Sequence, residues 1–228
     1  MSVAVDLARE SVRALNQRLH DLAPATNERH WRVLNPLGAH AIAAGLTVPV
    51  ELEVMGHVGF YCAGMNQHAS VTIHGHAGPG VAENMMSGVV RVKGNASQGA
   101  GASGRGGLLV IEGDAASRCG ISMKGIDIVV AGSVGHMSAF MAQKGNLVVL
   151  GDAGPDLGDS IYEARLYVRG AVASLGADCI EKPLRDEHRA DLARLLAAAG
   201  IDADPRSFRR YGSARRLYHF HVDHAGDY

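Results

Sequence analysis

The chain has 228 residues, of which 47% are hydrophobic and 20% are charged, and its formal net charge is −1. This near neutrality gives no electrostatic reason to expect nucleic acid or an anionic membrane surface as a partner. The three cysteines form no Cys-x-x-Cys pair, and we find no signal peptide or run of about 18 apolar residues, so we expect a soluble, cytoplasmic protein without a zinc or iron–sulfur site.

The first 29 residues form an N-terminal segment. Its apolar residues recur at helical spacing between residues 5 and 22, at Leu7, Val12, Leu15 and Leu19. This pattern predicts one amphipathic helix that ends before Pro24 and caps the fold that follows. After a polar link over residues 25–29, residues 31–44 hold the only Trp and an Asn-Pro turn, and we interpret them as an atypical first unit of a repeat.

From residue 50 to residue 174, glycine recurs at a fixed interval of 19 residues without an insertion. The seven positions are Gly56, Gly75, Gly94, Gly113, Gly132, Gly151 and Gly170. An aliphatic residue stands four positions before each glycine and a β-branched residue stands two positions before it, so the two share one face of a short strand. The residue between them is often polar or charged and varies freely. Small residues follow three positions after each glycine and, in six repeats, seven positions after it.

Self-similarity at a period near 20 residues, combined with strand-like alternation, predicts a solenoid of stacked coils. A leucine-rich repeat has an overlapping period, but its Leu-x-x-Leu-x-Leu ladder and its Asn are missing. We therefore predict an all-β fold, a parallel β-helix over residues 30–175 with flanking helices, whose glycines turn the corner where φ is positive or coils approach closely. The predicted internal ladder is Val54, Ile73, Val92, Ile111, Val130, Val149 and Val168.

Residues 176–228 form a C-terminal segment without the repeat. Apolar residues at helical spacing over residues 180–199, followed by Gly200, predict a helix that covers the other end of the solenoid. Beyond residue 207 the chain is basic and aromatic, which is typical of a segment that packs on its own body or on a partner. The possible interface residues are Phe208, Arg209, Arg210, Tyr211, Arg215, Arg216 and Tyr218.

Two motifs resemble ligand sites. Residues 99–104 read Gly-Ala-Gly-Ala-Ser-Gly and match the dinucleotide-binding fingerprint, but a strand rather than a helix is expected after them, so we interpret them as coil turns. His219, His221 and His224 could approach one metal, although no matching carboxylate or Cys spacing supports a metal site, and packing or interface histidines are the favoured interpretation.

Three further groups are weighed against ordinary packing. Methionines in residues 83–86 and in residues 137–141 could form a partner surface or pack at coil edges. Histidines that stand near the coil glycines are interpreted as exposed turn residues, and Cys62 and Cys119 as small buried thiols. We therefore expect no catalytic, cofactor-binding or metal-ligating residue in this chain, which has the pattern of a scaffold.

The coils resemble a known domain. Residues 56–65 (Gly-His-Val-Gly-Phe-Tyr-Cys-Ala-Gly-Met), 80–88 and 158–164 are similar to the GXGXG domain, the right-handed β-helix at the C-terminal end of the glutamate synthase large subunit. This resemblance covers about residues 30–175. With residues 208–215 (Phe-Arg-Arg-Tyr-Gly-Ser-Ala-Arg) included, nearly the whole chain resembles the narrower family of stand-alone GXGXG proteins, which comprises the β-helix subunit of N-methylglutamate synthase and GlxC-like proteins.

The resemblance implies a non-catalytic structural subunit of a heteromeric N-methylglutamate synthase, which makes N-methylglutamate and ammonia from glutamate and methylamine. It implies two partners, a glutamine amidotransferase-like subunit and a glutamate synthase-like subunit that carries FMN and an iron–sulfur cluster. No catalytic residue is carried over, because the β-helix of glutamate synthase holds no cofactor. Two alternatives remain: a scaffold subunit of another glutamate synthase-like enzyme, and a stand-alone β-helix enzyme or binding protein.

Overall fold

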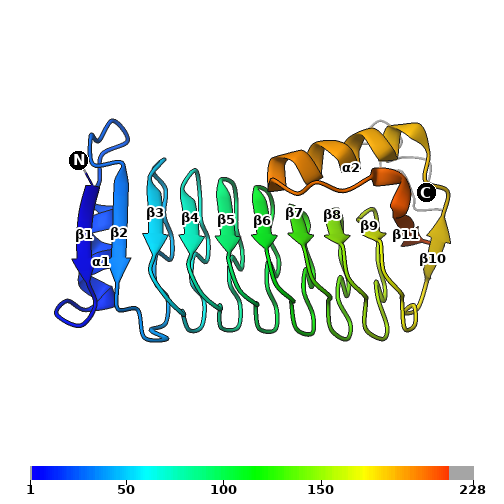
Figure 1. Cartoon of the computed structure of the whole chain (residues 1–228), viewed down its shortest axis with the longest axis horizontal. Helices are drawn as coiled ribbons and strands as arrows, with labels where there is room; N and C mark the ends of the chain where they lie inside the picture. Colours follow the sequence, from blue (N-terminus) through cyan, green and yellow to red (C-terminus); the bar gives the residue numbers. More distant parts are fainter. Residues whose placement is uncertain (1, 216–228) are drawn as a thin grey trace, which may run out of the picture.

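The computed structural model describes residues 2–215, which form one elongated parallel β-helix (Figure 1). Its sheet contains eleven strands in the order β1-β2-β3-β4-β5-β6-β7-β8-β9-β11-β10, and all pairs from β1 to β9 are parallel. The strands are β1 (Ser2–Asp6), β2 (His30–Leu34), β3 (Glu51–Val54), β4 (Ser70–Ile73), β5 (Val89–Val92), β6 (Leu108–Ile111), β7 (Lys124–Val130), β8 (Lys144–Val149), β9 (Arg165–Val168), β10 (Cys179–Lys182) and β11 (Arg209–Ser213). The helices are α1 (Val12–His20), α2 (Asp186–Ala199) and the short 3-10 helix η1 (Pro205–Ser207).

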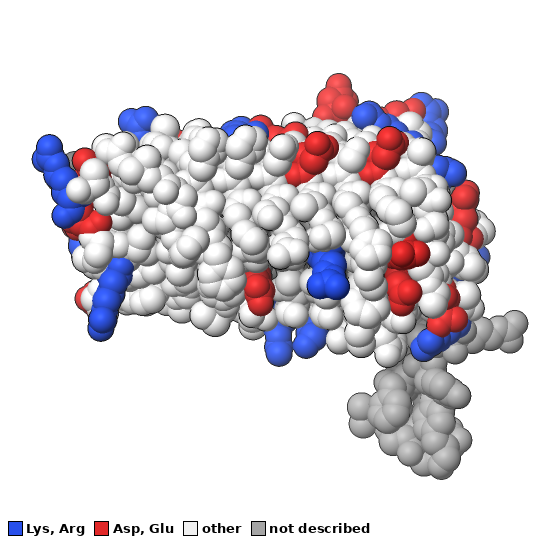
Figure 2. Space-filling model, turned by 90° about the horizontal axis from the view of Figure 1, so that it is seen from below, with Lys and Arg blue, Asp and Glu red and all other residues white. Residues whose placement is uncertain are grey.

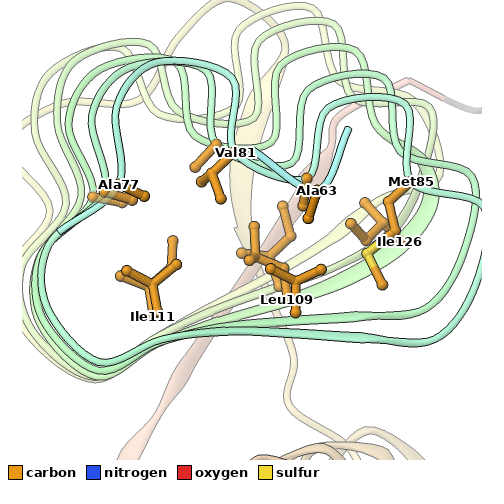
Figure 3. Close-up of a cluster of buried hydrophobic side chains, with 14 of the residues drawn as sticks. Ala63, Ala77, Val81, Met85, Leu109, Ile111 and Ile126 are labelled. Carbon is orange, nitrogen blue, oxygen red and sulfur yellow. The ribbon is translucent and has the colours of Figure 1, made fainter. Parts of the chain in front are cut away.

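The 19-residue period is the register of the sheet, as the sequence predicts. Val54 pairs with Ile73, Ile73 with Val92 and so on to Val168, and all seven members of the predicted ladder are fully buried. A second buried ladder, from Leu52 to Leu166, runs beside the first. Figure 3 shows Leu109 and Ile111 from these two ladders pointing into the interior of the coils, opposite small residues such as Ala63 and Ala77. The predicted β-helix is confirmed.

The coil glycines allow successive turns to touch. The backbone N–H of Gly94 donates to the carbonyl of Gly75 at 3.0 Å, and the same bond recurs at every later coil glycine up to Gly170. A Cβ atom on Gly75 would lie 2.6 Å from the carbonyl carbon of Gly56 and 2.8 Å from its oxygen, which no real Cβ tolerates. Gly56 alone among the seven has a positive φ, of 146°. Close approach, rather than left-handed backbone, therefore explains the other six glycines.

Left-handed residues shape the arc that returns each coil to its next strand. Residues five, seven and nine positions after the glycine have positive φ, as in Gly99 (69°), Gly101 (68°) and Ser103 (55°). These residues belong to the dinucleotide-like motif over residues 99–104, which the structure places in an arc that leads into β6 without a helix. A Cβ on Gly101 would lie 2.6 Å from the Cδ1 of Ile128. The small residue seven positions after the glycine thus leaves room for the core.

The N-terminal prediction is correct for α1 but wrong for the residues before it. Residues 2–6 form β1, because Val3 and Val5 alternate with smaller or polar residues and the strand finds a parallel partner in β2. Helix α1 begins after Ser11, whose hydroxyl accepts from the N–H of Ala14 at 3.1 Å. Its Leu15 and Leu19 join the solenoid core. The helix therefore caps the first coil, as expected.

The position of α2 differs from the prediction. Residues 179–182 form strand β10, and α2 lies along the outer face of the sheet instead of over its end (Figure 1). Its apolar side packs on outward-facing residues of four strands and on Phe208. The helix contributes Leu192, Leu195, Leu196 and Ala199, and the sheet contributes Val110, Val129, Val148 and Tyr167. The same outward position holds Glu53, Thr72 and Arg91 in β3 to β5, so only the later coils need an apolar cover.

The last strand is inserted near the C-terminal end of the sheet, where β10 forms the edge. Strand β11 lies between β9 and β10 and pairs antiparallel with both. The side chain of Tyr211 joins the solenoid core, while Phe208 joins the cluster under α2. The predicted stop at Gly200 is confirmed, since this residue ends α2 with φ of 71°.

Candidate functional site

The predicted interface segment is largely integral to the fold. Phe208 and Tyr211 are buried, so these two aromatic residues bind the chain's own body. Arg209 reaches the surface, where its guanidinium donates to the carbonyl of Gly170 at 2.9 Å. Arg216, Tyr218 and the histidines at positions 219, 221 and 224 lie outside the described residues. A partner contact by this segment stays a prediction and depends on its arginines.

The arginines border a groove of about 770 Å³ beside β11. Its walls come from the beginnings of β7 and β8, from residues 162–165, and from strands β10 and β11. The lining is rich in charged side chains, with five cations and two carboxylates. The cations are Lys144, Arg165, Lys182, Arg210 and Arg215, and the carboxylates are Asp127 and Glu163.

Two of these cations are already neutralised. The guanidinium of Arg165 lies 2.8 Å from the carboxylate of Asp191 in α2, and Arg215 forms an ion pair with Asp178. Among residues 2–215, Lys144, Lys182 and Arg210 have no carboxylate within ion-pair distance. The groove therefore holds cations whose counter-ions are not supplied by the described part of the chain.

Burial shifts the titration of Arg210, which lines the groove, and of two groups that interact with it, Tyr167 and His188. It lowers the pKa of the Arg210 guanidinium, where the effects of Arg165 and Arg185 act in the same direction and those of Tyr167 and Glu187 oppose them. It also lowers the pKa of the His188 imidazole, to which Arg210 contributes, and raises the pKa of the Tyr167 phenol. All three shifts disfavour the charged form, and burial is the largest cause of each.

A second polar feature runs along the corners of the coils, and the reasoning from sequence missed it. The side chain directly after each of the first six coil glycines accepts a hydrogen bond from a backbone N–H of the next coil, at 2.7–3.0 Å. We call this series the corner ladder. Its members are His57, His76, Asn95, Asp114, Ser133 and Asp152. The sequence does contain a signal for the corner ladder, because all six of these side chains can accept a hydrogen bond.

The corner ladder accounts for two of the turn histidines. The rings of His57 and His76 stack at a centroid distance of 4.9 Å, and the Nδ1 of each accepts a backbone N–H. His74 and His136 instead lie 3.2 Å from the carboxylates of Glu53 and Asp156. The corner side chains His57 and His76 thus help to hold successive coils together. On the face seen from below in Figure 2, Lys, Arg, Asp and Glu side chains are only scattered.

The methionine groups do not form one surface. Met85 is fully buried and points into the core in Figure 3, whereas Met86 and Met141 are exposed on coils that are three repeats apart. Phe60 is also exposed, beside Tyr61 at 5.4 Å between ring centroids. The structure thus separates these aromatic residues, on the coil that begins with β3, from the exposed Met86 and Met141 on later coils.

The three cysteines are free and buried, as expected for structural thiols. Burial raises the pKa of Cys62 and Cys119 to about 12 and that of Cys179 to about 11, so they stay protonated at neutral pH. Within residues 2–215, no three His, Cys, Asp or Glu side chains gather in a geometry that could hold a metal ion. Nor is any helix of this part of the chain long and apolar enough to cross a membrane.

The chain is similar to a curated bacterial protein over nearly its full length. Over 225 residues, which are 98% of this chain and 99% of the other, it is 62% identical to Protein GlxC of Rhizobium meliloti (strain 1021). No family model matches the chain. Identity this high over nearly all of both chains shows common descent, and the chain belongs to the GlxC protein family.

Proposed function

We propose that this chain is the non-catalytic β-helix subunit of a heteromeric glutamate synthase-like enzyme, specifically N-methylglutamate synthase. The observation that carries the proposal is the uninterrupted glycine register of β3 to β9, whose coils resemble the GXGXG domain of glutamate synthase. Full-length similarity to GlxC agrees with a stand-alone version of that domain. The enzyme would convert glutamate and methylamine to N-methylglutamate and ammonia.

The physical case for a scaffold lies in how the repeat uses its side chains. Inward positions fill the core, coil glycines bond to one another, and the corner ladder is engaged by backbone N–H groups. Six intervals of about 4.8 Å between β3 and β9 make a rod section of roughly 30 Å. Such a rod can hold two other subunits at a fixed separation.

The chemistry would belong to two partners. One is a glutamine amidotransferase-like subunit, and the other is a glutamate synthase-like subunit with FMN and an iron–sulfur cluster. This chain would orient them and contribute no acid, base or nucleophile. Its cysteines support this division, because buried thiols with raised pKa values are poor nucleophiles.

Co-purification tests the proposal. A tagged copy of the full chain, co-expressed with both candidate partners, should retain both through size-exclusion chromatography, and the flavin absorbance should follow the complex. The chain purified alone should be colourless. The proposal fails if the two partners form a stable complex that excludes this chain, or if the chain alone retains a stoichiometric flavin.

The main competing hypothesis is a scaffold for another glutamate synthase-like reaction. It predicts the same complex but a different amine donor. Assaying the purified complex with glutamate and methylamine and, separately, with glutamine, a 2-oxo acid and a reductant distinguishes the two, since N-methylglutamate forms only in the first assay and reductive amination of the 2-oxo acid occurs only in the second. Activity in the second assay alone would replace the proposed substrate while leaving the scaffold role intact.

A further inference from the structure

Two cations face each other across the last strand pair. Lys182 of β10 and Arg210 of β11 are direct partners in the antiparallel register, and both line the groove. Like charges at directly opposed positions destabilise a strand pair. The Lys182–Arg210 pair therefore lowers the stability of the fold unless an anion neutralises it.

Among residues 2–215, no carboxylate forms an ion pair with Arg210, and the nearby Glu187 acts on its charge only from beyond ion-pair distance. The Nη1 of Arg210 donates to the carbonyl of Pro183 at 3.3 Å, but its buried Nε meets no acceptor among residues 2–215. The carboxylate of Asp191 is engaged elsewhere, since it binds Arg165 at 2.8 Å. Arg210 is only partly buried and its Nη1 bond lies at the surface, so the guanidinium presents to the groove a charge that no described carboxylate pairs with.

The groove beside this pair has the size of a small-molecule site. Its volume of about 770 Å³ falls within the usual range of ligand pockets. The remaining cations extend the positive wall, with Lys144 and the ion-paired Arg215 also in the lining. The carboxylate of Asp127 accepts from the amide of Asn146 at 2.7 Å and forms no ion pair with either member of the Lys182–Arg210 pair.

We propose that the groove binds a small anion with carboxylate or phosphate groups, held between Lys182 and Arg210. Arginine favours such ligands because its planar guanidinium offers parallel N–H donors to two oxygens, and the lysine adds a point charge beside it. The proposal goes beyond the scaffold role and does not depend on it. It assigns this chain a ligand of its own.

Calorimetric titration of the full chain tests the site, with citrate as the carboxylate probe and inorganic pyrophosphate as the phosphate probe. At constant ionic strength, at least one probe should bind saturably at one site per chain. Arg210→Gln and Lys182→Gln should each weaken that binding by about tenfold or more, as expected for loss of a charge-assisted bond. The matched control is Arg32→Gln, at an exposed position of β2, which should bind the probe as the unaltered chain does.

A charge reversal provides a second, independent readout. Lys182→Glu places a carboxylate opposite Arg210, so it should raise the melting temperature and abolish binding of the probe. The proposal is overturned if neither probe binds saturably at millimolar concentration, or if both glutamine variants bind as tightly as the control. A melting temperature of folded Lys182→Glu below that of the unaltered chain would also contradict the proposal. It would show that a carboxylate at this position does not compensate the charge of Arg210.

Discussion

The carboxylate of Asp114 accepts a hydrogen bond of 2.7 Å from the backbone N–H of Ser133, one repeat further along the chain. The N–H of Asp114 in turn donates to the side-chain oxygen of Asn95, at 3.0 Å. Each corner side chain is therefore a bridge between two coils. Residues that look like a scattered polar surface act as structural ties, which explains why these His, Asn and Asp side chains need no chemical role.

Adding a methyl group at a coil corner should separate the coils. For Gly75→Ala we expect a loss of about 1–3 kcal/mol in the free energy of unfolding, because the new Cβ meets the backbone of Gly56 and His57 at 2.6–2.8 Å. Gly212→Ala is the control, since its Cβ would meet nothing closer than 3.7 Å. Urea denaturation measures both. Equal stability of the two variants would mean that close approach does not dictate glycine here.

Shortening a leucine of α2 should loosen the helix from the sheet. Leu192 is fully buried against the outer face of the later strands, so Leu192→Ala should cost about 2–5 kcal/mol of unfolding free energy. Arg194→Ala, on the exposed side of the same helix, should change stability little. If thermal unfolding shows the two variants to be alike, α2 does not cover the sheet as described.

One carboxylate should make stability depend on pH. Burial acts to raise the pKa of Glu112, but hydrogen bonds from Lys93 at 2.7 Å and Arg91 at 3.1 Å outweigh it and hold the pKa below its ordinary value of 4.5. The folded state thus favours the ionised form. Its contribution is present above pH 4.5 and is lost as pH falls through the lower folded pKa.

The variant Glu112→Gln removes that pH-dependent contribution. The difference in unfolding free energy between the unaltered chain and Glu112→Gln should be largest at neutral pH and shrink as the pH drops below 4.5. A difference that grows on acidification would show that the folded pKa is raised instead. Glu10→Gln, whose carboxylate pairs with Arg18 in the N-terminal segment, serves as a control for general carboxylate effects.

The position at which the chain is cut in its C-terminal segment should decide how stable the fold is, because residues 208–215 contain β11. Ending the chain after Ser207 removes β11, including the buried Tyr211, as well as Phe208, and it opens the sheet between β9 and β10. We expect a large loss of stability or insoluble protein. Ending it after Arg215 keeps every described strand pair and should give a higher melting temperature than ending it after Ser207. Two equally stable truncated chains would contradict the integral role of β11.

The repeat can be read from the sequence because glycine and aliphatic positions each serve one structural purpose. Leu109 and Ile111 have equivalents in every coil, so spacing alone predicts the β-helix and its core. The place of α2 does not follow from spacing, although the change from Arg91 to Val110 at the outward position marks where a cover is needed. Helical spacing predicts that a helix exists and buries one face, but it does not specify the surface beneath it.

Sites made by residues that are far apart in the sequence cannot be predicted from residue spacing. Lys182 and Arg210 lie 28 positions apart and meet only because β11 returns to pair with β10. A single sequence does not show this antiparallel return, since neither strand belongs to the 19-residue period. The charged groove beside them therefore appears only with the structure. The corner ladder is different, because its acceptor side chains follow the coil glycines directly and could be found from the sequence.

Reconstitution tests most directly the proposal that the solenoid assembles an enzyme without supplying its chemistry. The rate of methylamine-dependent N-methylglutamate formation should be measured with the two partner subunits alone and after addition of this chain. We predict little activity without the chain and full activity at a stoichiometric ratio. A chain carrying Cys62→Ala and Cys119→Ala should restore activity equally well. Full activity of the partners alone would contradict the proposal.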